Sequence, residues 1–146
     1  MNDRHIGYAV KSLNLRIGRM IRNIPAVREN GNLTTFQIWI LNYLFRNRDR
    51  DVFQRDVEAE FDIRRSTATQ LLKGMEESGF IKRTPVDYDA RLKKIVLTES
   101  AAEVRKQIQA QIEKAEYHMT SGFTPEELDA FFGYVDRFVR NLEECE

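Results

Sequence analysis

Residues 64–73 contain a run of basic and hydrogen-bonding side chains of the kinds that contact nucleic acids. Seven of these residues have side chains that can contact a nucleic acid: Arg64, Arg65, Ser66, Thr67, Thr69, Gln70 and Lys73. An arginine can pair with guanine and a glutamine with adenine, each through two hydrogen bonds, whereas a lysine suits a phosphate. A helix that begins near Arg65 would fit the major groove of B-DNA and present these side chains to base edges. The alternative interpretation of Arg64 and Arg65 is a solvated helix start.

A second group of charged residues, Asp89, Arg91 and Lys93, lies in or beside a predicted β-hairpin. Residues 80–83 and 93–97 are expected to form two short strands, and residues 84–90 a polar loop between them. A basic hairpin tip can reach the DNA backbone or the neighbouring minor groove. Taken alone, the basic residues of this segment are also compatible with an ordinary surface.

The formal net charge of zero conceals an uneven distribution of charge along the chain. The first 94 residues carry 18 basic and 12 acidic side chains, a net charge of +6, and the last 52 carry 5 and 11, a net charge of −6. A neutral protein with a basic module can bind nucleic acid locally, because phosphate contacts depend on the local field. Charge alone leaves open a mixed, solvated surface without a partner.

Length and composition restrict the class of protein. A chain of 146 residues indicates one domain, and 42% apolar residues are enough for a core. The sequence contains no apolar run of the length that spans a membrane and no apolar segment typical of a secretory signal. Its single cysteine, Cys145, excludes an internal disulfide framework. We therefore expect a cytoplasmic protein that is not in a membrane.

Apolar residues at helical spacing predict the elements that position the two charged groups. Six helices are expected to begin near residues 6, 34, 54, 65, 98 and 124, and the first should run to Ile24, where Pro25 ends or kinks it. Thr34 and Thr124 each precede a Gln or Glu by three residues, the spacing of a capping box. Asp62 is expected to adopt a left-handed conformation in the tight turn before residue 65. Residues 30–32 are expected to form a turn, and Gly79 is expected to end the helix that begins near residue 65. The predicted fold class is mainly α with a small β-hairpin wing.

Three segments of this region resemble a known family. Residues 53–72, 75–83 and 89–99 are similar to the helix-turn-helix, the end of the recognition helix and the wing of MarR-type (multiple antibiotic resistance regulator) transcription factors. The wing carries an Asp-x-Arg pair, Asp89 and Arg91, before its return strand. The similarity covers residues 33–99, and the flanking helices match the family in number and order.

The resemblance implies a single MarR-like domain over residues 1–146. Residues 6–30 and 99–146 would be dimerisation helices, and residues 33–98 would be a winged helix-turn-helix lobe that binds double-stranded DNA. It implies a ligand-responsive regulator, a repressor by analogy, that acts as a homodimer on a near-palindromic operator. By position in the family, Arg91 would enter the minor groove and Asp89 would orient it.

The helix that begins near Thr34 contains the candidate ligand residues Trp39 and Tyr43. An indole and a phenol in an uncharged stretch can stack on a small aromatic effector and hydrogen-bond to it. Family pockets lie beside this helix, so the effector is expected where it meets the long dimerisation helices. For Phe36, Trp39 and Tyr43 the first expectation is a place in the core, and contact with a ligand is the alternative.

Enzymatic and metal-binding functions have no support in the sequence. It contains no phosphate-binding glycine-rich loop and no nucleophile or metalloprotease motif, so no catalytic residue is assigned. His5 and His118 have no further ligands at metal spacing, and neither a metal nor another cofactor is expected. The remaining alternative is a winged-helix module that binds proteins and no DNA. The base-reading residues Arg65, Thr69 and Gln70 favour DNA.

Overall fold

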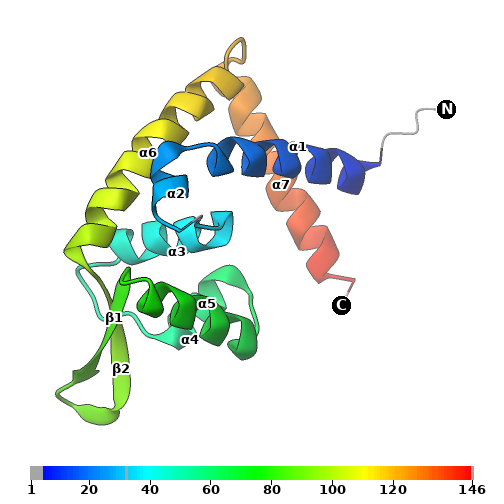
Figure 1. Cartoon of the computed structure of the whole chain (residues 1–146). Helices are drawn as coiled ribbons and strands as arrows, with labels where there is room; N and C mark the ends of the chain where they lie inside the picture. The colour runs from blue at the N-terminus through cyan, green and yellow to red at the C-terminus, as the bar shows by residue number, and fades with distance from the viewer. Residues whose placement is uncertain (1–4, 32, 146) are drawn as a thin grey trace. The chain divides into compact units, whose positions relative to one another are not determined.

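The computed structural model describes residues 5–31 and 33–145, so the turn expected at residues 30–32 lies partly outside the described residues. The chain divides into two compact units, Met1–Gln111 and Ile112–Glu146, which are described separately. In chain order the elements are α1 (Ile6–Arg22), α2 (Pro25–Glu29), α3 (Thr35–Arg46), α4 (Gln54–Phe61), α5 (Arg65–Glu77), β1 (Ile81–Val86), β2 (Asp89–Leu97), α6 (Glu99–Met119) and α7 (Pro125–Glu143) (Figure 1). This arrangement confirms the predicted fold class, mainly α with a small β-hairpin.

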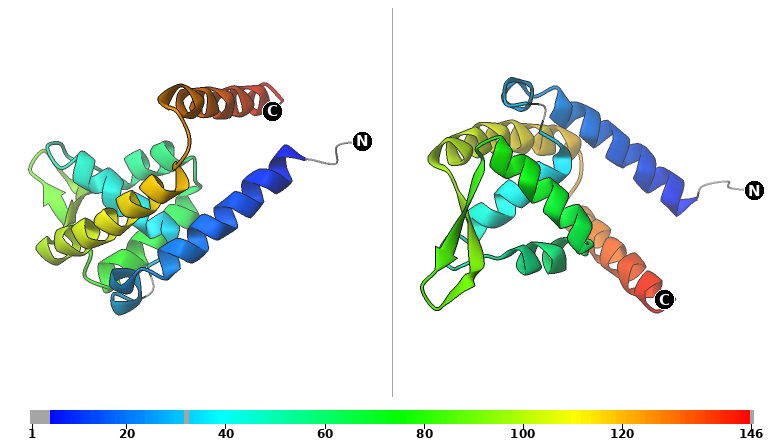
Figure 2. Two further views of the ribbon diagram at one scale, coloured as in Figure 1. Left: turned by 90° about the horizontal axis from the view of Figure 1, so that it is seen from above. Right: turned by 60° about the horizontal axis from the view of Figure 1, so that its bottom comes forward.

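Helix α3 forms the centre of the first unit. Its capping box is present, because the Thr34 hydroxyl accepts from the Gln37 N–H at 3.1 Å and the Gln37 side chain accepts from the Thr34 N–H at 3.0 Å. The other helices of this unit enclose α3 (Figure 2). The first unit contains these buried residues: Val27, Ile38, Ile40, Leu41, Val57, Leu72, Met75, Ile81 and Ile108. The burial of so many large apolar side chains supplies the main driving force for folding of this unit.

Helices α4 and α5 form the helix-turn-helix, and a left-handed residue sets the turn between them. Asp62 has φ 48° and ψ 50°, as the sequence predicted. At the start of α4 the Asp56 carboxylate accepts from the Phe53 N–H at 2.8 Å, which is the N3 half of a capping box, and the side chain of Phe53 makes no cap. Helix α5 ends at Gly79, whose φ of 78° lets the Phe80 N–H reach the Met75 carbonyl at 2.9 Å.

The wing is an antiparallel hairpin that extends from the helices as a separate arm (Figure 1). Its regular ladder runs from Ile81↔Leu97 to Pro85↔Lys93 and then shifts to Val86↔Asp89. The expectation of a polar loop over residues 84–90 was wrong, because Asp87 and Tyr88 alone form the turn and residues 90–92 form a bulge on β2. A bulge twists its strand and redirects side chains, and Arg91 lies in it.

Two expectations about the α1–α3 region were also wrong. Helix α1 ends at Arg22, and a separate helix α2 begins at Pro25. The residue before a proline disfavours the helical conformation, and Ile24 is accordingly extended, with ψ 124°. Trp39 is not a core residue, because 46% of its surface is exposed. Its neighbours Ile38 and Ile40 face the core, and Trp39 lies on the outer face of α3.

The second unit contains α7 and the end of α6. The predicted capping box of α7 is present, because Thr124 and Glu127 exchange hydrogen bonds of 2.8 and 3.1 Å. The large apolar side chains along α7 are exposed, apart from the half-buried Leu128, and they comprise Phe131, Phe132, Val135, Phe138, Val139 and Leu142. Among the described helices of the protein, none is long and apolar enough to cross a membrane.

Candidate nucleic-acid interface

Helix α5 presents a continuous polar face to solvent. Ala68, Leu72 and Met75 are fully buried and fix the rotation of the helix about its axis. The opposite side is consequently exposed, and it contains all of the side chains that the sequence predicted there: Arg65, Ser66, Thr67, Thr69, Gln70 and Lys73. Arg64, the residue before the helix, is exposed as well and makes no side-chain cap. This face is free to enter a groove of nucleic acid.

The tip of the wing carries an exposed arginine. The side chain of Arg91 is 92% exposed, and its backbone N–H donates to Asp89 Oδ1 at 2.9 Å. The Arg91 Nε lies 3.4 Å from the same oxygen, so Asp89 contacts Arg91 as the family pattern predicted. Lys93 is exposed on β2. Lys94, its neighbour, instead pairs with Asp51 at 3.2 Å.

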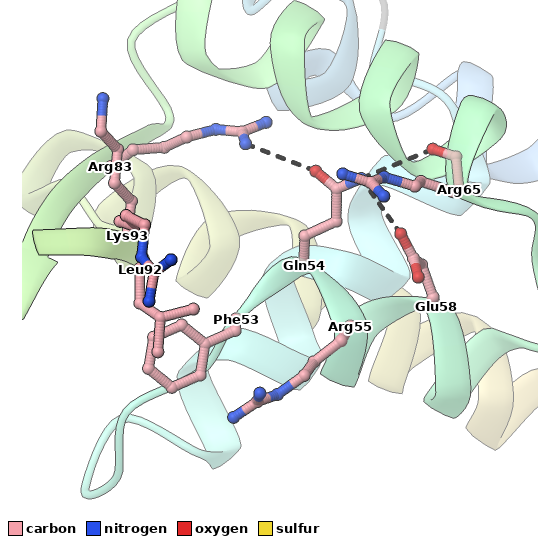
Figure 3. Close-up of a pocket in the computed structure, with 9 residues that line it drawn as sticks. Phe53, Gln54, Arg55, Glu58, Arg65, Arg83, Leu92 and Lys93 are labelled. Carbon is pink, nitrogen blue, oxygen red and sulfur yellow. Dashed lines mark hydrogen bonds between the residues drawn. The ribbon is translucent and has the colours of Figure 1, made fainter. Parts of the chain in front are cut away.

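The fold brings one residue of the α5 group and two of the wing group to one groove, of about 410 Å³, between α4, the start of α5 and the wing (Figure 3). Arg65 from α5 and Arg91 and Lys93 from the wing line it together. Arg55 of α4 and Arg83 of β1 line the same groove, and Glu58 is its one acidic residue. Five cations and one carboxylate around a single groove produce a positive local field that suits a phosphate backbone.

Two residues at the floor of this groove were missed by the sequence analysis. Gln54 is half-buried in the first turn of α4, and its amide contacts Glu58 and Arg83 (Figure 3). The same amide also contacts Thr69 of α5. Arg83 Nε in turn lies 3.6 Å from Glu76 Oε2 on α5. The contact of Gln54 with Glu58 could have been predicted, because residues four apart lie on one face of a helix. The contacts with Thr69 and Arg83 form only when α4, α5 and β1 pack together.

A second pocket, of about 320 Å³, contains both candidate ligand residues. Trp39 and Tyr43 line it on α3, and Phe61 lies on its α4 side. Arg46 and Arg50 add positive charge, and Arg50 donates to the Tyr43 hydroxyl at 2.9 Å. From the sequence, the effector site was expected between α3 and the long helices. The described residues that line this pocket come instead from α3, α4 and the segment between them.

The described residues contain no cluster of three or more His, Cys, Asp or Glu that could hold a metal ion. Cys145 is exposed at the end of the chain, and its thiol donates to the Asn141 carbonyl at 3.3 Å.

Comparison with known proteins identifies the architecture. The MarR family model matches residues 32–92. The transcription regulator MarR from Oenococcus oeni is 30% identical, with 93% of this chain and 99% of that chain covered and a TM-score of 0.76. An uncharacterised HTH-type transcriptional regulator of Bacillus subtilis, YybA, is 28% identical over 98% of this chain and 91% of its own length.

The fold is also that of a solved DNA complex. The Staphylococcus aureus protein MepR, crystallised with DNA, has a TM-score of 0.86 over 97% of this chain and 99% of that chain, at 18% identity. Family and fold are those of transcription regulators rather than of enzymes. The sequence similarity to the Oenococcus oeni regulator extends over both chains almost entirely, so it includes the flanking helices as well as the winged module. This protein belongs to the MarR family of transcriptional regulators.

Proposed function

We propose that this protein is a homodimeric regulator that binds double-stranded DNA at a near-palindromic operator and acts as a ligand-responsive repressor. The observation that carries the proposal is the exposed polar face of α5 beside a groove lined by five cations. The residues proposed to contact DNA are Arg64, Arg65, Ser66, Thr67, Thr69, Gln70, Lys73, Asp89, Arg91 and Lys93. Membership of the family and the DNA complex of the structurally similar MepR support it.

Helix α5 and the wing are assigned different tasks. The first turns of α5 carry Arg65 and Gln70, the side-chain types that pair with guanine and adenine in the major groove. The wing places Arg91 on a bulge with 92% of its side chain exposed, where a cation meets phosphates or a narrow minor groove. Helix α5 therefore provides sequence preference, and the wing provides affinity.

Dimerisation is assigned to the ends of the chain, residues 6–30 and 99–146, with residues 33–98 as the DNA-binding lobe. Helix α7 exposes a contiguous apolar face, including Phe138 at 43% and Leu142 at 69% exposure, and the first half of α1 exposes Ile6 and Val10. Apolar surface on this scale is unfavourable in water and marks an interaction site. A second copy of the chain covers these faces across a two-fold axis, which explains the symmetry of the operator.

The pocket beside Trp39 and Tyr43 is proposed as the effector site. Its aromatic side chains suit a small aromatic ring, and Arg46 and Arg50 suit a carboxylate on that ring. Because the pocket adjoins α4, an occupant changes the position of the DNA-binding helices only if it binds one conformation more tightly than the other. An effector that binds more tightly to the conformation with the weaker DNA affinity releases the protein from DNA.

The test is selection of binding sites by the full chain from a library of random duplexes, followed by gel-shift assays on the selected sequence. Enrichment of a two-fold symmetric motif is the expected result, with sedimentation showing a dimer. A segment containing residues 33–99 alone should lose dimerisation and most of the affinity. If the full chain enriches no sequence and shows no salt-dependent binding to DNA, the protein is instead a winged-helix module for protein partners.

A further inference from the structure

The amide of Gln54 lies among four polar groups contributed by three elements. Its Nε2 is 3.1 Å from Glu58 Oε1, 2.9 Å from Thr69 Oγ1 and 3.5 Å from the Arg65 carbonyl oxygen. Its Oε1 is 3.4 Å from Arg83 Nη1 (Figure 3). One side chain of α4 therefore contacts both α5 and the wing at the floor of the cationic groove.

The chemistry of two of these partners fixes the orientation of the amide. A carboxylate only accepts hydrogen bonds, and a guanidinium only donates them. Nε2 must therefore face Glu58 and Oε1 must face Arg83, since the flipped amide would set oxygen against oxygen and nitrogen against nitrogen. Glu58 and Arg83 alone set this orientation, so it does not depend on where the hydroxyl proton of Thr69 points.

The orientation of Gln54 determines the role of the Thr69 hydroxyl. Nε2 has two hydrogens, and the two short contacts, to Glu58 and to Thr69, use both. Thr69 Oγ1 is thus an acceptor toward Gln54, and its own proton points elsewhere. Within the part of the chain that the structure describes, the Thr69 hydroxyl has no second hydrogen-bond partner, and the residue is exposed on the polar face of α5. Accepting from Gln54 leaves the hydroxyl its proton and one lone pair. Because the amide donor occupies the side that faces Gln54, the proton points toward DNA, where a base acceptor satisfies it and a base donor leaves it without a partner.

We propose that Gln54 is a positioning residue that sets the base preference of Thr69 by holding its hydroxyl as a hydrogen-bond donor. In the major groove guanine, adenine and thymine each offer an acceptor, whereas cytosine offers its amino donor alone. Thr69 should therefore discriminate against cytosine at one position in each half-site. This inference rests on the proposed function, because it requires α5 to read DNA.

The test begins with the site selected by the wild-type protein and replaces each base of one half-site with cytosine in turn. At the base that Thr69 contacts, cytosine should weaken binding about fivefold, the worth of one hydrogen bond. Gln54→Met removes the amide donor, so the proton of Thr69 can turn away from the base and a cytosine no longer leaves it without a partner. The cytosine penalty at that position should then fall to less than about twofold. Gln54→Glu is made together with Glu58→Gln, so that the new carboxylate accepts from an amide where it would otherwise face the carboxylate of Glu58. The group that contacts Thr69 is then an acceptor, so Thr69 must donate to it and present an acceptor to DNA. This variant should prefer cytosine at the same position.

Three further variants separate positioning from simple stability. Thr69→Val should remove the cytosine penalty and make Gln54→Met silent when the two changes are combined, whereas Thr69→Ser should retain the penalty. Gln107→Met makes the same chemical change at an exposed position of α6, outside the proposed DNA interface, and should leave the relative preference among the four bases unchanged. A purely structural role for Gln54 would weaken binding to all four bases equally. Thermal melting of each variant shows whether it is folded. If Gln54→Met does not fold, the Gln54→Glu, Glu58→Gln double variant still tests the proposal.

The possible outcomes distinguish this inference from the proposed function. If the wild-type protein selects no DNA sequence, the proposed function fails and the inference fails with it. If it selects a site but Gln54→Met and the Gln54→Glu, Glu58→Gln double variant keep the wild-type preference at every position, DNA reading is retained and the role of Gln54 is overturned. Loss of the cytosine penalty in the first variant and its reversal in the second support the inference.

Discussion

Replacement of Arg91 with alanine tests the division of work between α5 and the wing. The side chain is 92% exposed, and its only described partner is the nearby Asp89. The substitution removes one cation from each lobe without opening a cavity. We therefore expect the free energy of unfolding to change by less than about 0.5 kcal/mol, as for most exposed positions.

The magnitude of the effect on DNA binding follows from counterion release. Each phosphate contact contributes a slope of about −0.9 to the dependence of log K on log salt, so two lobes that each lose one contact reduce the slope by about 1.8. When the salt concentration rises fourfold, the variant should therefore lose about twelvefold less of its DNA affinity than the wild-type protein loses. Because the lost contact is not to a base edge, the operator and unrelated DNA should both be affected.

Fluorescence anisotropy of a labelled duplex, titrated at several salt concentrations, measures these slopes. Arg137→Ala is the matched control, because it also removes an exposed arginine and lies outside the proposed DNA interface, on the side of α7 opposite the apolar face that is assigned to dimerisation. Its slope should equal that of the wild-type protein. If Arg91→Ala leaves both the slope and the affinity unchanged, the wing does not contact DNA and the proposed docking is wrong.

Three other predictions concern the remaining parts of the proposal. Arg65→Ala or Gln70→Ala should weaken operator binding by about 1–3 kcal/mol and relax preference at one base pair per half-site; equal losses on all sequences would argue against base reading. Phe138→Asp, which places a charge on the exposed apolar face of α7, should convert the dimer to a monomer in sedimentation, and a dimer of unchanged strength would place the interface elsewhere. Aromatic carboxylates that bind the α3–α4 pocket should quench Trp39 fluorescence and weaken DNA binding, whereas a broad panel with neither effect would contradict the effector site.

Local sequence signals determined much of the secondary structure. The capping boxes at Thr34 and Thr124 were predicted and are present, because both partners of each lie within one helical turn. The left-handed Asp62 and the end of α5 at Gly79 were also predicted, since each depends on the conformational preference of a single residue. The exposed face of α5 follows from the spacing of Ala68, Leu72 and Met75, which fixes the side that packs inward.

Tertiary structure decided the features that depend on residues far apart in the chain. The hairpin register places Arg91 in a bulge, because strand pairing selects which residues oppose one another and no local rule specifies it. The packing of α3 left Trp39 exposed, although the apolar composition of this helix alone suggested that the residue is buried.

The contacts of Gln54 show the same limit at the candidate site. The sequence identified the chemical types that read DNA, since donor and acceptor groups belong to each residue itself. It could not identify Gln54, because its contacts with Thr69 and Arg83 span 15 and 29 positions of the chain and form only when α4, α5 and β1 pack together. The identity of a side chain fixes the hydrogen bonds it can make, and the packing of the fold selects the ones it does make.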